Sequence, residues 1–293
     1  MKDKFTGLGV ALVTPFDQAG EVDYDALGRL VDSVVDGGVD YIVALGTTAE
    51  TPTLTHPERE HVARFIRERN AGRVPLVIGM GGNNTAKLCE ELRTFDPTGF
   101  DAVLSVTPYY NRPSQEGLFC HYKAIAEASP LPIILYNVPS RTGVNMSAET
   151  TLRIAREVPN VVAVKEACGE ISQIQDIVKG APEGFLVLSG DDAMTLPLMS
   201  VGGHGVISVI ANAFPERLAQ MVHTAQKSVA KAQAIWADFE YLCPMLFVEG
   251  NPTGIKTALS VKGVCRADVR LPLVEASGKL RAAMEDAINE YAL

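Results

Sequence analysis

The chain has 293 residues, of which 47% are hydrophobic and 21% charged, the composition of an ordinary globular protein with a large core. Its formal net charge of −9 would repel a phosphate backbone and no basic cluster offsets it, which argues against nucleic acid as a partner. No apolar run is long enough to span a membrane, and the start MKDKFTGLGV lacks the apolar segment of a signal peptide, so we expect a cytoplasmic protein.

Short apolar, β-branched runs recur along the chain and predict strands separated by amphipathic helices. The predicted strands cover residues 9–15, 40–46, 74–80, 101–108, 132–139, 161–167, 185–191 and 205–209. In the first helical pattern, Leu27, Leu30 and Val34 lie on one face, and the pattern ends at two glycines. In the second, Thr55 and Glu58 have the spacing of a capping box.

The order of these elements predicts the fold class. Near-continuous apolar strands that alternate with helices indicate an α/β protein with a parallel sheet, and eight such units predict a closed (β/α)8 TIM barrel. An open doubly wound sheet is the alternative, but GVALVTPFD lacks the glycine-rich turn that this fold needs after its first strand. Helical patterns over 225–242 and 273–291 then predict a C-terminal helical extension, so we place the barrel domain at 1–225 and a helical domain at 226–293.

Polar residues follow the predicted strands at their carboxyl ends, where TIM barrels have their active sites. We therefore expect these residues to converge on one rim of the barrel. In chain order they are Thr47, Thr48 and Glu50; Thr107, Tyr109 and Tyr110; Tyr136 and Asn137; Lys165 and Glu166; Ser189, Gly190, Asp191 and Asp192; and Ile207 and Ser208.

Lys165 is the unusual member of this set, because it ends the apolar run VVAVKEACG. Alternation along a strand points Lys165 and Glu166 to opposite faces, so Lys165 lies either in the barrel mouth or under the helices. A desolvated amine that loses its proton near neutral pH can attack a carbonyl and form a Schiff base. A lysine that snorkels to solvent or pairs with Glu166 is an equally good interpretation of Lys165 alone.

Other rim residues favour the Schiff-base hypothesis. Tyr136 at the neighbouring strand end could shuttle the protons that such chemistry requires, although a core tyrosine is the alternative. Thr47 and Thr48 suit a bound carboxylate or form a mere turn. Arg141 offers a fork for a second carboxylate, although a loop arginine is usually just solvated.

Metal and cofactor sites find little support in the sequence. The five histidines and five cysteines lack the spacings of metal ligands, so we expect neither a metal nor another cofactor. Cys168 is close to Lys165, but packing is the favoured role for a small thiol there. Asp191 and Asp192 would oppose a phosphate, and we expect a carboxylate substrate without one.

The motifs GTTAE, TPYYNRPSQEG, YNVPSRTG, VKEA, SGDDA and GGHGVISV, in this order and spacing, resemble the dihydrodipicolinate synthase family of pyruvate-dependent Schiff-base aldolases. The resemblance covers nearly the whole chain, including FVEGNPTGIKTAL. It implies a lyase of diaminopimelate and lysine biosynthesis, with pyruvate and L-aspartate 4-semialdehyde as substrates. It also implies a homotetramer built as a dimer of dimers.

The resemblance also implies a role for each matching residue. Lys165 would form the Schiff base with pyruvate, and Tyr136 would transfer protons beside it. Thr47 would continue the proton relay, which Tyr110 would complete from the neighbouring subunit. The remaining assignments concern binding: Thr48 for the pyruvate carboxylate, Arg141 for the carboxylate of the semialdehyde, and the backbone of Gly190 and Ile207 for the pocket wall.

Two other functions stay open. Aldolases of N-acetylneuraminate or 2-keto-3-deoxy sugar acids resemble this family and share the lysine and tyrosine, but Arg141 and Tyr110 are typical of the synthase. The other is a catalytically silent barrel that binds an oxo acid. The intact set of Lys165, Tyr136, Thr47 and Tyr110 argues against it.

The chain departs from the family pattern at two places. Ala49 replaces the usual glycine of GTTGE, and it would be strained if a left-handed backbone were needed; we expect the turn to survive. In the cleft where lysine inhibits many members, Asn83, His56 and Tyr109 match, but Lys87 replaces a glutamate and Arg59 a histidine. Two cations in a cleft for a cationic ligand predict weak or absent inhibition by lysine.

Overall fold

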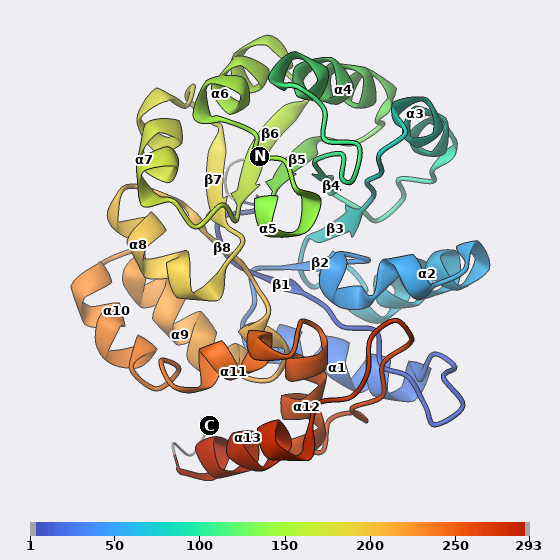
Figure 1. The fold of residues 1–293 in the computed structure, drawn as a ribbon, viewed down its shortest axis with the longest axis vertical. Helices are drawn as coiled ribbons and strands as arrows, with labels where there is room; N and C mark the ends of the chain where they lie inside the picture. Colours follow the sequence, from blue (N-terminus) through green and yellow to red (C-terminus); the bar gives the residue numbers. More distant parts are fainter. Residues whose placement is uncertain (1–3, 291–293) are drawn as a thin grey trace.

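The computed structural model describes residues 4–290 as a closed barrel of parallel strands surrounded by helices (Figure 1). Each strand pairs with its sequence neighbour, and the first pairs with the last. The prediction of an α/β TIM barrel is therefore confirmed. The strands are β1 Gly7–Ala11, β2 Tyr41–Ala44, β3 Leu76–Gly79, β4 Ala102–Val106, β5 Ile133–Asn137, β6 Val161–Glu166, β7 Leu186–Ser189 and β8 Gly205–Ser208.

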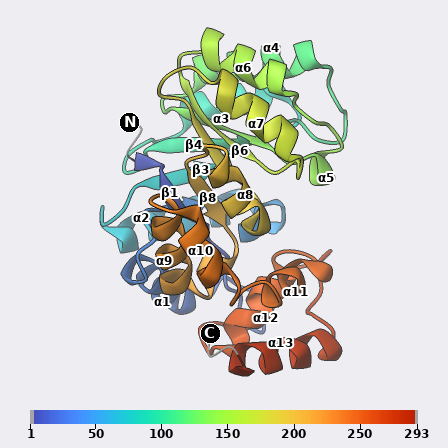
Figure 2. The ribbon, with the colours of Figure 1, turned by 90° about the vertical axis from the view of Figure 1, so that its left-hand side faces the viewer.

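Helices cover the outside of the barrel, and the last three lie together beyond it, as Figure 2 shows. No helix within the described part of the chain is both long and apolar enough to cross a membrane. The helices are α1 Tyr24–Asp36, α2 His56–Asn70, α3 Thr85–Thr94, α4 Gln115–Ala128, α5 Pro139–Thr142, α6 Ala148–Glu157, α7 Ile171–Gly180, α8 Thr195–Ser200, α9 Pro215–Ala225, α10 Val229–Trp236, α11 Leu242–Val248, α12 Thr253–Val261 and α13 Gly278–Glu290.

Strand alternation divides the core into two layers. In β2, Tyr41 and Val43 belong to the cluster that fills the barrel, whereas Ile42 and Ala44 pack under the helices. All four side chains are buried, which explains why the strands lack a polar alternation in the sequence.

The helix signals in the sequence are confirmed where α2 begins. The Thr55 side chain accepts from the Glu58 amide, and the Glu58 carboxylate accepts from the Thr55 amide at 2.7 Å. This reciprocal pair satisfies two amides that the first turn leaves without helical partners.

The first strand was predicted too late in the chain. It covers Gly7–Ala11 instead of 9–15, because the chain leaves the ladder after Leu12. The Val13 amide donates to the Asn212 side chain at 3.0 Å, and the Thr14 hydroxyl donates to the carbonyl of Ala49 at 2.8 Å. Long-range side-chain bonds therefore end this strand, and an apolar pattern does not reveal them.

The predicted helices of the C-terminal part are confirmed in outline but not in extent. The pattern over 225–242 is interrupted, because Ser228 is extended between α9 and α10 and a further turn precedes α11. The last helix begins at Gly278, five residues later than predicted, and Tyr291 lies outside the described residues. The division into domains at residue 226 stays a prediction.

A buried ion pair connects this C-terminal part to the barrel rim. Lys256 Nζ on α12 donates to a carboxylate oxygen of Glu50 at 2.5 Å and to the carbonyl of Asp268 at 2.9 Å. Both side chains are fully buried. Burial lowers the pKa of Lys256, while the charge of Glu50 opposes that shift.

Candidate active site

Lys165 lies in the mouth of the barrel. It is two residues after Ala163, which belongs to the cluster inside the barrel, so alternation directs its side chain inward. Glu166 points to the opposite face, where its carboxylate accepts hydrogen bonds from Asn137. The alternative of a pair between Lys165 and Glu166 is therefore wrong. Only 5% of Lys165 is exposed.

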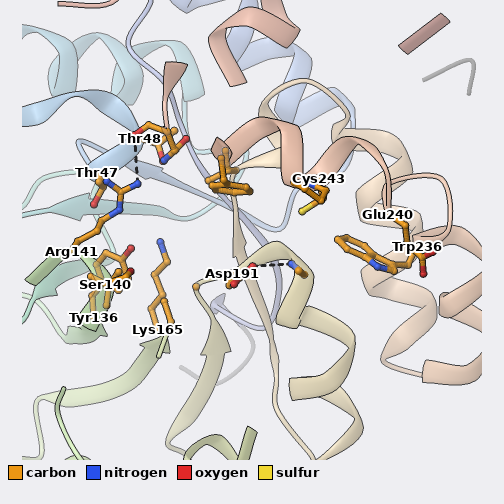
Figure 3. Close-up of a pocket in the computed structure, with 18 residues that line it drawn as sticks. Thr47, Thr48, Tyr136, Ser140, Arg141, Lys165, Asp191, Trp236, Glu240 and Cys243 are labelled. Carbon is orange, nitrogen blue, oxygen red and sulfur yellow. Dashed lines mark hydrogen bonds between the residues drawn. The ribbon is translucent and has the colours of Figure 1, made fainter. Parts of the chain in front are cut away.

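Tyr136 lies beside Lys165 on the neighbouring strand. The two residues are register partners in the β5 and β6 ladder. The amine Nζ of Lys165 lies 4.2 Å from the centroid of the Tyr136 ring. Figure 3 shows the Lys165 side chain extending into the pocket between Tyr136 and Asp191. The amine of Lys165 therefore lies against the ring of Tyr136 at the mouth of the barrel.

Gly190 leaves room for the stem of this lysine. A Cβ at position 190 would lie 2.8 Å from Cβ of Ala167 and 3.1 Å from both Cγ and Cε of Lys165. Any larger residue would push against the Lys165 side chain. The requirement here is a close approach, since Gly190 has no left-handed backbone.

Thr47 and Thr48 lie in a short 3₁₀ helix, Thr47–Ala49, after β2. Both line the pocket. The left-handed residue of this turn is Glu50, with φ of 54°, and its carboxylate is held by Lys256 and the Arg270 amide. Ala49 therefore needs no left-handed conformation, and the turn forms with alanine there as expected.

Arg141 extends from the short helix α5 into the pocket beside Thr47 and Thr48 (Figure 3). Its guanidinium contacts the carbonyl of Asn251 at 3.5 Å and otherwise remains exposed. Asn251 Nδ2 donates to the hydroxyl of Thr48 at 3.0 Å. The other amide atom, Oδ1, is buried and has no hydrogen-bond partner within residues 4–290.

These residues surround one cavity of about 520 Å³. It contains six of the predicted site residues and lacks two. Thr47, Thr48, Tyr136, Arg141, Lys165 and Gly190 line the cavity. Ile207 is buried in the barrel below, and Tyr110 is 89% exposed, outside the cavity, with its amide 3.4 Å from the carbonyl of Thr142.

One wall of the cavity was not predicted from the sequence. It comes from the C-terminal helical part and includes Trp236, Glu240, Cys243, Phe247 and Asn251. The motif FVEGNPTGIKTAL includes Phe247 and Asn251 of this wall. It follows the last predicted strand, and its sequence alone did not predict that it would contact the barrel rim.

A buried carboxyl group and a partly buried thiol near the cavity have shifted pKa values. Burial raises the pKa of Asp192 to about 6, although the Ser208 hydroxyl and the Val209 amide donate to its carboxylate. Burial also raises the pKa of Cys168 to about 12, which makes a thiolate nucleophile unfavourable and supports the packing role.

Comparison with known proteins decides the family. The model of the dihydrodipicolinate synthetase family matches residues 4–291. The chain belongs to this family. It is 56% identical over 269 residues to a 4-hydroxy-tetrahydrodipicolinate synthase of Parabacteroides distasonis, covering 92% of this chain and 91% of the relative. It is 51% identical to the synthase of the same name from Phocaeicola vulgatus, covering 99% and 98%.

Solved structures agree with this assignment. The dihydrodipicolinate synthase of Aquifex aeolicus superposes with a TM-score of 0.94 at 42% identity, covering 99% of both chains. The predictions of an enzyme and of a Schiff-base-forming lyase of this family are confirmed. Within the described residues, no group of three or more histidines, cysteines and acids could hold a metal ion.

Proposed function

We propose that the chain is a 4-hydroxy-tetrahydrodipicolinate synthase that condenses pyruvate with L-aspartate 4-semialdehyde. The product serves diaminopimelate and lysine biosynthesis, and we place the enzyme in the cytoplasm. The observation that carries the proposal is the buried amine of Lys165, 4.2 Å from the Tyr136 ring at the mouth of the barrel.

In the proposed reaction, the Lys165 amine attacks the keto carbon of pyruvate, and the carbinolamine loses water to give an imine. Loss of a methyl proton gives an enamine, whose carbon attacks the aldehyde. Tyr136 donates the proton that the new alkoxide takes up. The amino group of the second substrate then attacks the imine carbon, and release of Lys165 closes the ring.

The lining residues support this pair of substrates. Thr48 would hold the pyruvate carboxylate, with the backbone of Gly190 as the pocket wall and Ile207 buried below the cavity. Arg141 would bind the carboxylate of the semialdehyde. Arg141 favours the synthase over the sugar-acid aldolases, because a polyol substrate would suit a small or hydroxylated residue at this position.

The proposed proton relay requires a second subunit. Thr47 lines the cavity beside Tyr136, whereas the exposed Tyr110 lies outside it. A neighbouring copy would supply its Tyr110 to complete the relay through Thr47. We propose that two such dimers form a homotetramer, as the resemblance to the family implies.

A coupled assay tests the second substrate. We expect turnover with pyruvate and aspartate semialdehyde and none with N-acetylneuraminate or 2-keto-3-deoxygluconate. Replacing Arg141 with alanine should raise KM for the semialdehyde roughly 10-fold to 100-fold, because a charged hydrogen bond contributes about 1.5–3 kcal/mol. Trapping of pyruvate by borohydride should be unaffected in this variant. Turnover of a sugar acid alone would overturn the proposed function.

We also expect lysine to inhibit this enzyme weakly or not at all. Lys87 lies exposed on α3, 3.8 Å from Glu91, and Asn83 donates to the Tyr109 carbonyl at 3.0 Å. A cationic ligand near Lys87 and Arg59 would be repelled. Steady-state rates at increasing lysine concentration measure this, and Lys87→Glu should increase the inhibition. Half-inhibition of the wild type at physiological lysine levels would contradict the prediction.

A further inference from the structure

A second pair of polar residues lies directly behind the two proposed catalytic side chains. Asn137 follows Tyr136, Glu166 follows Lys165, and Asn137 and Glu166 are register partners across β5 and β6. Alternation directs both away from the cavity, toward the helical layer. Glu166 is 1% exposed and Asn137 is fully buried.

The two side chains are bonded to each other. Asn137 Nδ2 lies 2.9 Å from Oε1 and 3.1 Å from Oε2 of Glu166. The Cys168 amide donates to Oε1 at 2.8 Å, and Gln173 Nε2 donates to Oε2 at 3.2 Å. Burial raises the pKa of the Glu166 carboxyl above its usual value, and these hydrogen bonds oppose that shift without cancelling it. Every partner found for this carboxylate within residues 4–290 is a neutral donor.

The same asparagine closes the loop that carries Arg141. Asn137 Oδ1 accepts from the Met146 amide at 2.9 Å, and Asn137 Nδ2 lies 2.8 Å from Oδ1 of Asn145. Helix α5, with Arg141, lies between these contact points. Asn145 is also bonded to Gln173 on α7, through its Nδ2 at 2.8 Å. Figure 3 shows Arg141 and Tyr136 on the same side of the cavity.

We propose that Glu166 and Asn137 are positioning residues that together fix Lys165, Tyr136 and the Arg141 loop relative to one another. The inference rests on the proposed function, because it assumes the roles given to those three residues. Neither Glu166 nor Asn137 touches the reacting atoms. Their hydrogen bonds prevent the two strand ends from shifting, and a displacement of about 1 Å at such a site can cost 100-fold in rate.

Replacement of Glu166 by glutamine tests the donor and acceptor pattern with almost no change in shape. The new amide group puts a donor opposite a donor, whichever way it is oriented. We expect kcat to fall at least tenfold, and KM for the semialdehyde to rise severalfold through the Arg141 loop. KM for pyruvate should change less than threefold. Asn137→Asp, which opposes two carboxylates, should lower kcat at least as much.

The exchange variant, with Glu166→Gln and Asn137→Asp together, is the decisive rescue. The new side-chain amide at position 166 can donate to the new carboxylate at position 137, which can also accept from the Met146 amide. The oxygen of the new side-chain amide can accept from the backbone amide of Cys168. We expect kcat above that of either single variant, recovering at least half of the loss on a logarithmic scale. A merely structural role would change the melting temperature of the single variants and leave their kcat within twofold of wild type.

Asn70→Asp is the matched control. Asn70 is equally buried, bonds to Val74 at the other end of the barrel, and should change the melting temperature without moving kcat or either KM beyond twofold. Glu166→Asp, which retains the charge but shortens the side chain, serves if the glutamine variant does not fold; it too should lower kcat at least tenfold.

The outcomes separate the two proposals. A wild-type enzyme that gives no borohydride adduct with pyruvate at Lys165 overturns the proposed function and this inference with it. The other outcome requires that the wild type forms the adduct normally. If the folded Glu166→Gln variant then has a kcat within twofold of wild type, only the positioning role is overturned. The same criterion applies to Glu166→Asp if the glutamine variant does not fold. The positioning role is also overturned if the exchange variant folds but has a kcat no higher than that of the single variants.

Discussion

Replacing Lys165 with alanine is expected to abolish the pyruvate adduct and to lower kcat roughly 10⁴-fold or more, as removal of a covalent nucleophile does in other enzymes. No other lysine lines the cavity in the described part of the chain, so no neighbouring amine can replace it. Mass spectrometry after borohydride treatment with pyruvate measures the adduct, and the coupled assay measures kcat.

Two further lysine variants control this experiment. Lys165→Arg retains a positive charge that proteins do not deprotonate, and we expect it to be as inactive as the alanine variant. Lys123→Ala removes an exposed lysine of α4 and should retain both the adduct and the activity. An adduct on the Lys165→Ala chain, or activity in the arginine variant near that of the wild type, would refute the nucleophile.

The sequence predicts the reactive side of the site because strand periodicity is a local property. Lys165 and Tyr136 end two apolar runs that become β6 and β5, and alternation then directs Lys165 inward. The capping pair Thr55 and Glu58 is also local, and its prediction is confirmed. Eight regularly spaced runs sufficed to predict the barrel.

What the sequence does not predict depends on contacts between distant residues. β1 ends early because Asn212 bonds to the Val13 amide, 199 positions away. Asn251 joins the site through Thr48, which is 203 positions away. Helical periodicity shows which face of a helix is buried, but it does not show which other element that face packs against. The wall formed by the C-terminal helices was missed for this reason.

The contact between Lys256 and Glu50 gives the second large effect. Replacing Lys256 with methionine is expected to lower the free energy of unfolding by about 3–5 kcal/mol, because it leaves the Glu50 carboxylate buried without a cation. The Arg270 amide, which donates to the other Glu50 oxygen at 2.9 Å, is a neutral partner. A chain of this size should melt roughly 10 °C lower.

The double variant Lys256→Met with Glu50→Gln distinguishes an unpaired charge from lost packing. The glutamine carries no charge and its oxygen can still accept from the Arg270 amide, so most of the lost stability should return.

An exposed ion pair serves as the control. Glu285→Ala on α13 breaks the exposed pair with Arg281 and should lower the free energy of unfolding by about 1 kcal/mol at most. Melting is compared at one protein concentration, since association would shift it. Equal losses in the single and double variants would contradict this account and leave packing around Phe16, whose ring centroid lies 4.0 Å from Lys256 Nζ, as the dominant contribution.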